Sequence, residues 1–183
     1  MLNALSKSGH RGFTLIELIV GIAILAILVS AAIPSFQSWM LSTQVRTAAE
    51  SVQNGLQRTR SEAVGHNTNV AFTLTDPAGI NSSWSIDITQ PASGVAPNID
   101  SRSSNEGSSK VTIAALPAGA TSIAFNGFGS VVPNAANLTQ IEFLANGSNR
   151  KFQVEISVGG SVRMCDCNQP LNANPRACTI ACP

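Results

Sequence analysis

The residues best suited to chemistry are four cysteines in the last part of the sequence, spaced C-x-C…C-x3-C: Cys165, Cys167, Cys178 and Cys182. An even, clustered set behind an export-like N-terminal segment predicts two disulfides made in an oxidising compartment. The same spacing could instead supply a tetrathiolate zinc site. Because we expect this segment to be exported, we favour disulfides and expect neither a metal nor a cofactor. Three pairings are open, and a bond between Cys165 and Cys167 is the least favourable.

A carboxylate, Glu17, lies at the start of a long apolar run. The sequence has no charged residue from Leu18 to Val45, and residues 18–33 are almost wholly apolar. A run of this length can cross a bilayer as a helix, which needs about 20 residues. An ionised side chain in hydrocarbon costs roughly 2.5–3.5 kcal/mol or more. Glu17 therefore calls for an explanation that a plain membrane anchor does not give.

Two simple interpretations of the N-terminal segment are a signal anchor and a cleaved signal peptide. Lys7 and Arg11 precede the apolar run, so the positive-inside rule places the N-terminus in the cytoplasm and the rest of the chain outside. Val29 and Ala31 are small enough for a signal-peptidase site after Ala31. Neither interpretation accounts for Glu17.

A third interpretation comes from the hexapeptide GFTLIE, Gly12 to Glu17, which follows a short basic leader. Here the sequence resembles the type IV pilin and pseudopilin class. The resemblance implies that residues 1–12 are a leader, cleaved after Gly12, and that Phe13 is N-methylated. It also implies that Glu17 neutralises the amine of a neighbouring subunit inside a filament, since buried charges are tolerated when they are paired.

The elements that position these groups begin with a single long helix, expected from Phe13 to about Gly65. Residues 13–40 are expected to form its transmembrane and filament-core part, with a kink at Pro34. Residues 41–66 are expected to form an amphipathic part that packs on a globular head. An apolar stripe at helical spacing supports this second part: Val45, Ala48, Ala49, Val52, Leu56 and Ala63.

Residues 67–183 are predicted to form a β-rich head. Seven alternating runs are expected to be strands, at residues 69–75, 83–89, 110–116, 121–127, 139–145, 151–158 and 161–165. Residues 90–109, rich in Pro, Ser, Asn and Gly, are expected to be a loop, either a contact loop or an insertion. The fold class is therefore α+β, with a long N-terminal helix packed on a pilin-like head.

The head resembles the GspH/FimT family of minor pilins and pseudopilins. The resemblance lies in residues 44–64, in IAFNGFGSV at residues 123–131, and in a last strand VRMCD followed by NPRAC. It implies the disulfide Cys165–Cys178, which leaves Cys167 to pair with Cys182; this second pair departs from the simpler one-disulfide tail of the FimT/FimU branch. It also implies partners, namely other minor and major pilins, the prepilin peptidase and the inner-membrane assembly platform. The protein would reside in the bacterial inner membrane, with a periplasmic head, and then in a pilus or pseudopilus.

We identify no catalytic constellation, so the sequence does not predict an enzyme. The chain has two histidines, and its serines lack a nucleophile-elbow context. Carboxylates occur singly along the expected strands, and we expect them to lie on solvated faces. A net charge of +1 argues against an overall electrostatic footprint for nucleic acid.

Three functions remain open. The first is a structural minor pilin that primes type IV pilus assembly, which the cysteine-rich tail favours. The second is a type II secretion pseudopilin. The third is DNA binding for natural transformation, through four basic residues of the last strands and tail: Arg150, Lys151, Arg163 and Arg176. Such contacts would weaken steeply with salt. We favour solvated basic residues over a DNA site.

Overall fold

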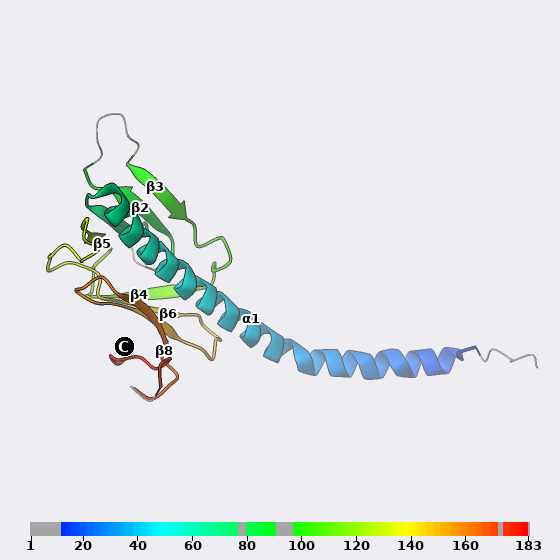
Figure 1. Ribbon diagram of the computed structural model, residues 1–183. Coiled ribbons are helices and arrows are strands. Elements are labelled where there is room, and N and C mark those ends of the chain that lie inside the picture. Colours follow the sequence, from blue (N-terminus) through cyan, green and yellow to red (C-terminus); the bar gives the residue numbers. More distant parts are fainter. Residues whose placement is uncertain (1–11, 77–79, 91–96, 172–173, 183) are drawn as a thin grey trace, which may run out of the picture. The chain divides into compact units, whose positions relative to one another are not determined.

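The computed structural model describes residues 12–76, 80–90, 97–171 and 174–182. The leader, apart from Gly12, and residues 91–96 of the expected loop lie outside these ranges. The described chain begins with one helix, α1 (Leu15–His66), which continues through Pro34 (Figure 1). The predicted helix is therefore confirmed to within two residues at its start. The chain divides into two units, which join within α1 between Gln37 and Ser38.

The end of α1 is fixed by local hydrogen bonds. Asn67 follows the helix with a φ of 49°, in the left-handed region that Asn tolerates better than most residues. The Asn67 N–H donates to the Val64 carbonyl at 3.3 Å, and the Thr68 N–H donates to the Ala63 carbonyl at 3.2 Å. This pair of bonds is the Schellman arrangement, which satisfies carbonyls that a helix end leaves without partners.

The described residues of the head form two antiparallel sheets of four strands each. The first sheet has the order β3-β2-β1-β5 and the second the order β4-β6-β7-β8. The first consists of β1 (Val70–Leu74), β2 (Trp84–Ile88), β3 (Asn98–Arg102) and β5 (Ser122–Phe125). The second consists of β4 (Thr112–Leu116), β6 (Gln140–Leu144), β7 (Phe152–Ile156) and β8 (Val162–Asp166). The seven predicted strands are all present.

The eighth strand, β3, lies within the segment that we expected to be a loop. It pairs antiparallel with β2, with a register irregularity at Ile86 and Asp87, and forms an edge of the first sheet. Its sequence, NIDSR, has a single apolar residue, and none of its five residues is fully buried. Backbone pairing rather than side-chain burial therefore holds it, and the expectation of a loop was wrong for these residues.

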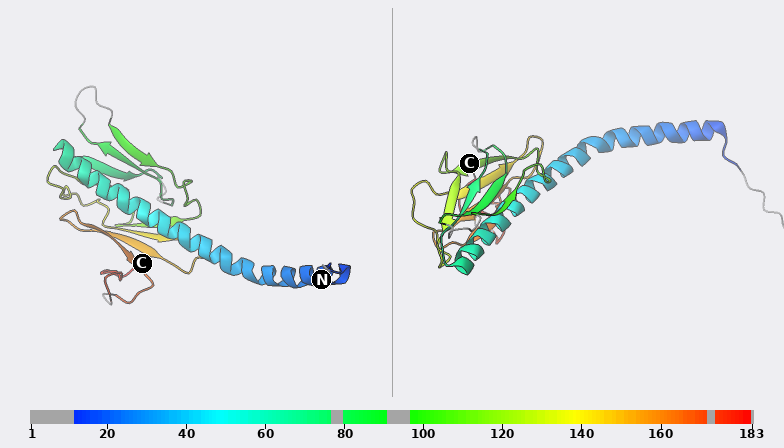
Figure 2. Two further views of the ribbon diagram at one scale, coloured as in Figure 1. Left: turned by 45° about the vertical axis from the view of Figure 1, so that its right-hand side comes forward. Right: turned by 90° about the horizontal axis from the view of Figure 1, so that it is seen from above.

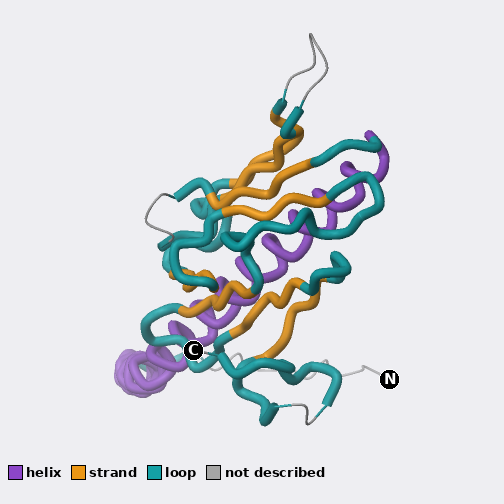
Figure 3. The backbone as a smooth tube through the Cα atoms, turned by 90° about the vertical axis from the view of Figure 1, so that its left-hand side faces the viewer, coloured by secondary structure: helices purple, strands orange, loops and turns teal. Residues whose placement is uncertain are grey.

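The part of α1 in the head, from Ser38 onward, runs across both sheets (Figures 2 and 3). All six residues of the predicted helix stripe have no exposed surface. They share one apolar core with residues from both sheets, including Phe72, Phe125 and Phe143. A Cβ at Gly55 would lie 2.9 Å from the Phe72 ring, so a glycine there lets the helix approach β1 closely.

Candidate functional site

The first candidate region is the start of α1, where Thr14 caps the helix. Its Oγ1 accepts a hydrogen bond of 3.3 Å from the Glu17 backbone N–H. Thr14 and Glu17 thus have the T-x-x-E spacing of a capping box, which favours a helix start at this position. A carboxylate in the first turn also interacts favourably with the helix dipole. The structure therefore places the Glu17 carboxylate four residues from Phe13, within the first turn.

The apolar side chains that follow are not covered by any other part of the described chain. Residues 12–37 are all exposed, and the most apolar 18-residue stretch of α1 has a mean hydropathy of 2.7. By length and composition this stretch is able to cross a membrane. Exposed apolar area on this scale marks a surface that a membrane or another protein covers.

The second candidate region is the outer face of the second sheet, the face turned away from α1. Strands β6 and β7 are buried on both faces. Ile141, Phe143 and Val154 belong to the apolar core, so the residues that alternate with them point the other way. These outer residues are polar and yet buried: Gln140, Glu142, Gln153 and Glu155. Our expectation that the strand carboxylates lie on solvated faces was wrong for Glu142 and Glu155.

Glu155 on this polar face is contacted by the C-terminal segment, which we call the tail (residues 168–171 and 174–182). Its Thr179 N–H and Ile180 N–H donate to the Glu155 carboxylate at 2.9 and 3.1 Å, and the Thr179 hydroxyl donates at 2.7 Å. Arg163 on β8 donates to the same carboxylate at 2.9 Å and to the Ala177 carbonyl at 3.1 Å. Glu155 is therefore the centre at which sheet and tail are joined.

These contacts change the acidity of Glu155. Burial by itself raises the pKa of the Glu155 carboxyl, but the hydrogen bonds from the Thr179 hydroxyl, Arg163 and the two tail amides outweigh it, and the pKa is lowered from 4.5. The carboxylate is therefore ionised at neutral pH. A buried charge with several donors is the form in which a protein tolerates such a group.

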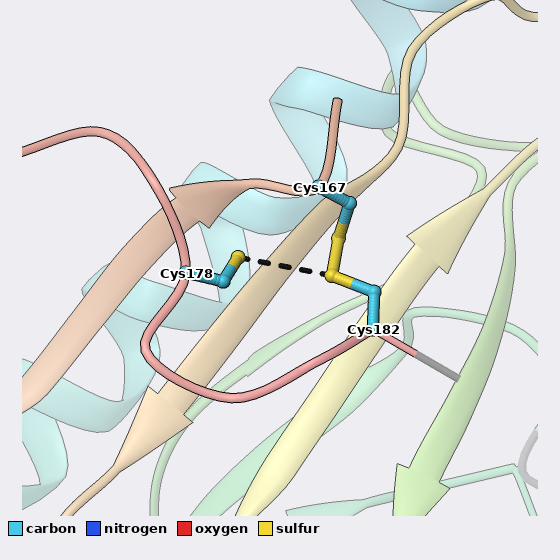
Figure 4. Close-up of side chains that lie close together, drawn as sticks. All are labelled: Cys167, Cys178 and Cys182. Carbon is cyan, nitrogen blue, oxygen red and sulfur yellow. Dashed lines mark hydrogen bonds between the residues drawn. A yellow bond between two sulfur atoms is a disulfide. The ribbon is translucent and has the colours of Figure 1, made fainter. Parts of the chain in front are cut away.

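Two disulfides hold the tail to β8 and the residue after it. They are Cys165–Cys178 and Cys167–Cys182, the pairing that the family resemblance implied. The two bridges are adjacent, with 3.7 Å between the Cys178 and Cys182 sulfurs (Figure 4). Zinc binds cysteine as thiolate, and a cystine sulfur has no thiolate charge. The oxidised tail therefore does not fit the zinc alternative.

Three of the four basic residues considered for DNA binding are engaged in ion pairs. Arg163 pairs with Glu155, Arg150 pairs with Asp166 at 2.9 Å, and Lys151 pairs with Glu142 at 3.1 Å. The fourth, Arg176, is exposed, and its side chain has no partner among the residues that the structure describes. The structure thus brings the first three to the second sheet, where each neutralises a largely buried carboxylate.

The role of Glu155 and Thr179 in joining sheet and tail was not foreseen from the sequence. One signal was present, since Gln140, Glu142, Gln153 and Glu155 place four polar groups on one face of two adjacent strands. However, a strand with one face in water shows the same alternation of apolar and polar residues, so the pattern alone does not tell a buried polar face from a solvated one. What distinguishes the two cases is the tail, whose amide donors are more than 20 residues away in the chain.

Comparison with known proteins gives two family matches. Residues 7–33 match the prokaryotic N-terminal methylation motif, and residues 48–177 match the family described as type II transport protein GspH. No curated protein matches the sequence at a significant level.

Two solved structures are similar to the chain, both of the type IV minor pilin FimU from Pseudomonas aeruginosa strain PAO1. In one crystal form the TM-score is 0.52 at 21% identity, with 74% of this chain and 96% of that chain covered. In the other the TM-score is 0.49 at 21% identity, with 73% and 98% covered. At this identity the first of these shows that the two proteins share a fold.

Proposed function

Since this chain belongs to the GspH family and carries the N-terminal methylation motif of prepilins, we propose that it is a minor pilin that helps to prime the assembly of a type IV pilus. The protein is a structural component and not an enzyme. The observation that carries the proposal is the exposed apolar part of α1, residues 15–37, with a single carboxylate in its first turn. Such a segment is built to be covered first by lipid and then by neighbouring helices.

Processing follows from the same residues. The prepilin peptidase would cleave after Gly12 and methylate the new amine of Phe13. Glu17 then becomes the fifth residue of the mature chain, able to pair with the amine of a neighbouring subunit in a low-dielectric filament core. Pro34 removes one hydrogen bond within α1, and we propose that this lets the helix bend as it enters the filament.

Membership of the family also supports assembly with other major and minor pilins on an inner-membrane platform. The choice of a pilus over a secretion pseudopilus rests on the tail. Its Cys165–Cys178 disulfide and its VRMCD…NPRAC pattern resemble those of pilus minor pilins, whereas the second disulfide departs from the simpler one-disulfide tail. A type II secretion role is the second candidate, which the description of the matched family favours. DNA binding is less favoured, because Arg150, Lys151 and Arg163 already neutralise carboxylates.

The test measures sheared surface pili in a deletion strain complemented with the wild-type chain, with Glu17→Ala, or with Glu106→Ala. Glu106 is an exposed carboxylate of the head and serves as the matched control. We expect loss of pili that the wild type and Glu106→Ala restore and that Glu17→Ala does not. Normal pili together with a defect in exoprotein secretion would replace the pilus role by the secretion role.

Processing is measured on the same strains by mass spectrometry of the membrane-extracted protein. We expect a mature N-terminus at methylated Phe13, and retention of the leader in a Gly12→Val variant. A mature N-terminus at Ala32 would instead identify a signal peptide cleaved after Ala31 and would contradict the prepilin assignment.

A further inference from the structure

A groove of about 660 Å³ lies in the head between α1 and the tail. We call it the arginine groove, after three arginines that come from three parts of the chain. Arg46 lies on α1, Arg150 lies just before β7, and Arg176 lies in the tail. Trp39 and two half-buried apolar side chains, Phe152 and Met164, also line it. The groove thus combines cations with an apolar wall.

The helix side of the arginine groove has a regular spacing. Trp39, Thr43 and Arg46 are separated by four and three residues, so they lie on one face of α1. The rise of the helix puts Arg46 about 10 Å beyond Trp39 along the axis. The Trp39 side chain is 63% exposed. An exposed tryptophan is therefore followed, two turns later and on the same face, by the first cation after the apolar run.

The charges of the arginine groove are only partly neutralised. Asp166 is the single acidic residue of its lining and pairs with Arg150. Arg46 pairs with Glu50 on the helix surface, and exposed pairs of this kind contribute little. The Arg176 side chain has no partner within the described part of the chain. Arg46 and Arg150 are each paired with one carboxylate, so the Arg176 charge leaves the groove with a net positive charge in a head that is otherwise close to neutral.

We propose that the arginine groove binds the phosphate headgroup of an anionic phospholipid in the leaflet from which the head emerges. The inference rests on the membrane-inserted stage of the proposed function and goes beyond it. Tryptophan is enriched at membrane–water interfaces, and Trp39 is the exposed tryptophan that follows the apolar run. Arginine guanidinium groups recognise phosphate through paired hydrogen bonds. With Trp39 at the interface, the Arg46 side chain lies within about one Debye length of the lipid phosphates.

A lipid headgroup suits this groove better than nucleic acid does. A nucleic-acid site presents a stripe of cations along the path of the backbone. Here the cations converge on one groove, next to a tryptophan and an apolar wall that can contact the glycerol and upper acyl carbons. The groove also starts where the apolar part of α1 ends, so a phospholipid is the anion that the chain meets first.

The test uses the full chain in nanodiscs of phosphatidylcholine and phosphatidylglycerol in equal parts. Bromine on the acyl chains of one lipid at a time quenches nearby tryptophan fluorescence. The chain has two tryptophans, and a Trp39→Phe variant gives the background from Trp84, which is buried. We expect brominated phosphatidylglycerol to quench Trp39 at least about twofold more than brominated phosphatidylcholine, and about 0.5 M salt to reduce the difference.

The variants distinguish an effect of the total charge of the head from an effect of the cations in the arginine groove. Arg46→Gln with Arg150→Gln and Arg176→Gln should abolish the preference for phosphatidylglycerol, and Arg176→Gln alone should reduce it without removing an ion pair. The control variant loses three positive charges elsewhere on the head, through Arg58→Gln, Arg102→Gln and Lys110→Gln. This variant should keep the preference for phosphatidylglycerol. Circular dichroism checks that each variant is folded.

Equal quenching by the two lipids, or an unchanged preference in the triple groove variant, would overturn the proposal. Equal quenching together with a DNA gel shift that the same variant loses would assign the groove to nucleic acid instead. Because quenching by either lipid already reports insertion, the result is independent of whether the strain makes pili. A strain that makes normal pili without this protein would therefore not contradict lipid binding. Equal quenching by the two lipids would likewise not contradict the pilus role.

Discussion

The Thr179 hydroxyl donates a 2.7 Å hydrogen bond to the carboxylate of Glu155, across 24 positions of the chain. The Thr179 and Ile180 amides and Arg163 donate to the same group. The tail of this pilin head is thus attached to β7 by charge-assisted hydrogen bonds as well as by its two disulfides. Bonds to an ionised group are roughly twice as strong as neutral ones, so this contact is a centre of stability for the head.

Replacing Glu155 with Gln should destabilise the head by about 1–3 kcal/mol, because an amide keeps the size of the side chain but loses its charge. The amide oxygen would accept fewer of the tail donors, and Arg163 would lose its ion pair. The measurement is urea unfolding of the oxidised full chain in detergent. Glu106→Gln, at an exposed carboxylate, should stay within about 0.5 kcal/mol of wild type. Equal stability of the two variants would contradict the role given to Glu155.

The pKa shift of Glu155 predicts how stability depends on pH. The pKa of this carboxyl is lowered from 4.5 in the folded chain, so the unfolded chain binds its proton more readily. The contribution of Glu155 is therefore full above that value and is lost as the pH falls through the folded pKa. Urea midpoints from neutral pH down to about pH 3 should fall less in Glu155→Gln than in wild type. Parallel curves for the two proteins would refute this assignment.

The two disulfides should contribute unequally. They close loops of similar length, with sequence separations of 13 and 15, so the chain-entropy model gives about 3 kcal/mol for each. Cys165 and Cys178 are both buried, whereas Cys182 is half-buried. Removing the first pair with Cys165→Ser and Cys178→Ser adds the cost of buried hydroxyls, about 1–3 kcal/mol each. Unfolding of this variant should therefore require less urea than unfolding of the Cys167→Ser, Cys182→Ser variant.

The close approach of α1 to the first sheet is tested at Gly55. An added Cβ would lie 2.9 Å from the Phe72 ring and 3.1 Å from the Trp84 ring, so Gly55→Ala should cost about 1–3 kcal/mol by overpacking. Gly65 on the same helix has open space around it, and Gly65→Ala should be neutral or stabilising by up to about 1 kcal/mol. The midpoints of thermal unfolding of the two variants are compared, because both gain helix propensity and only Gly55→Ala is crowded. A stabilising Gly55→Ala would show that the helix lies farther from β1.

Helix and strand prediction succeeded where side-chain burial follows a period. The stripe from Val45 to Ala63 and the alternation in VAFTL or WSIDI report the faces that lie in the core. Strand β3 was missed because NIDSR has one apolar residue and no alternation of apolar and polar residues. Its pairing with β2 is a property of the backbone, which hydrophobicity does not report.

Candidate sites made of residues close together in the sequence were predicted, and sites assembled from distant segments were not. The GFTLIE motif and the cysteines are local patterns, and the sequence identified both. The arginine groove was not predictable, because Arg46, Arg150 and Arg176 come from a helix, a turn and the tail. The same holds for Glu155, whose burial depends on Thr179 and Ile180. Contacts of this kind require the folded backbone.

The position of the tail in the chain also sets an order of events during synthesis. Thr179, Ile180 and both partner cysteines, Cys178 and Cys182, follow all eight strands. A chain leaves the ribosome N-terminus first, so these residues emerge after every strand that they hold. Until the tail arrives, Glu155 lacks its donors from Thr179 and Ile180 and neither cystine can close. Completion of the head is therefore a late event in folding, which the supply of oxidant for the two cystines can control.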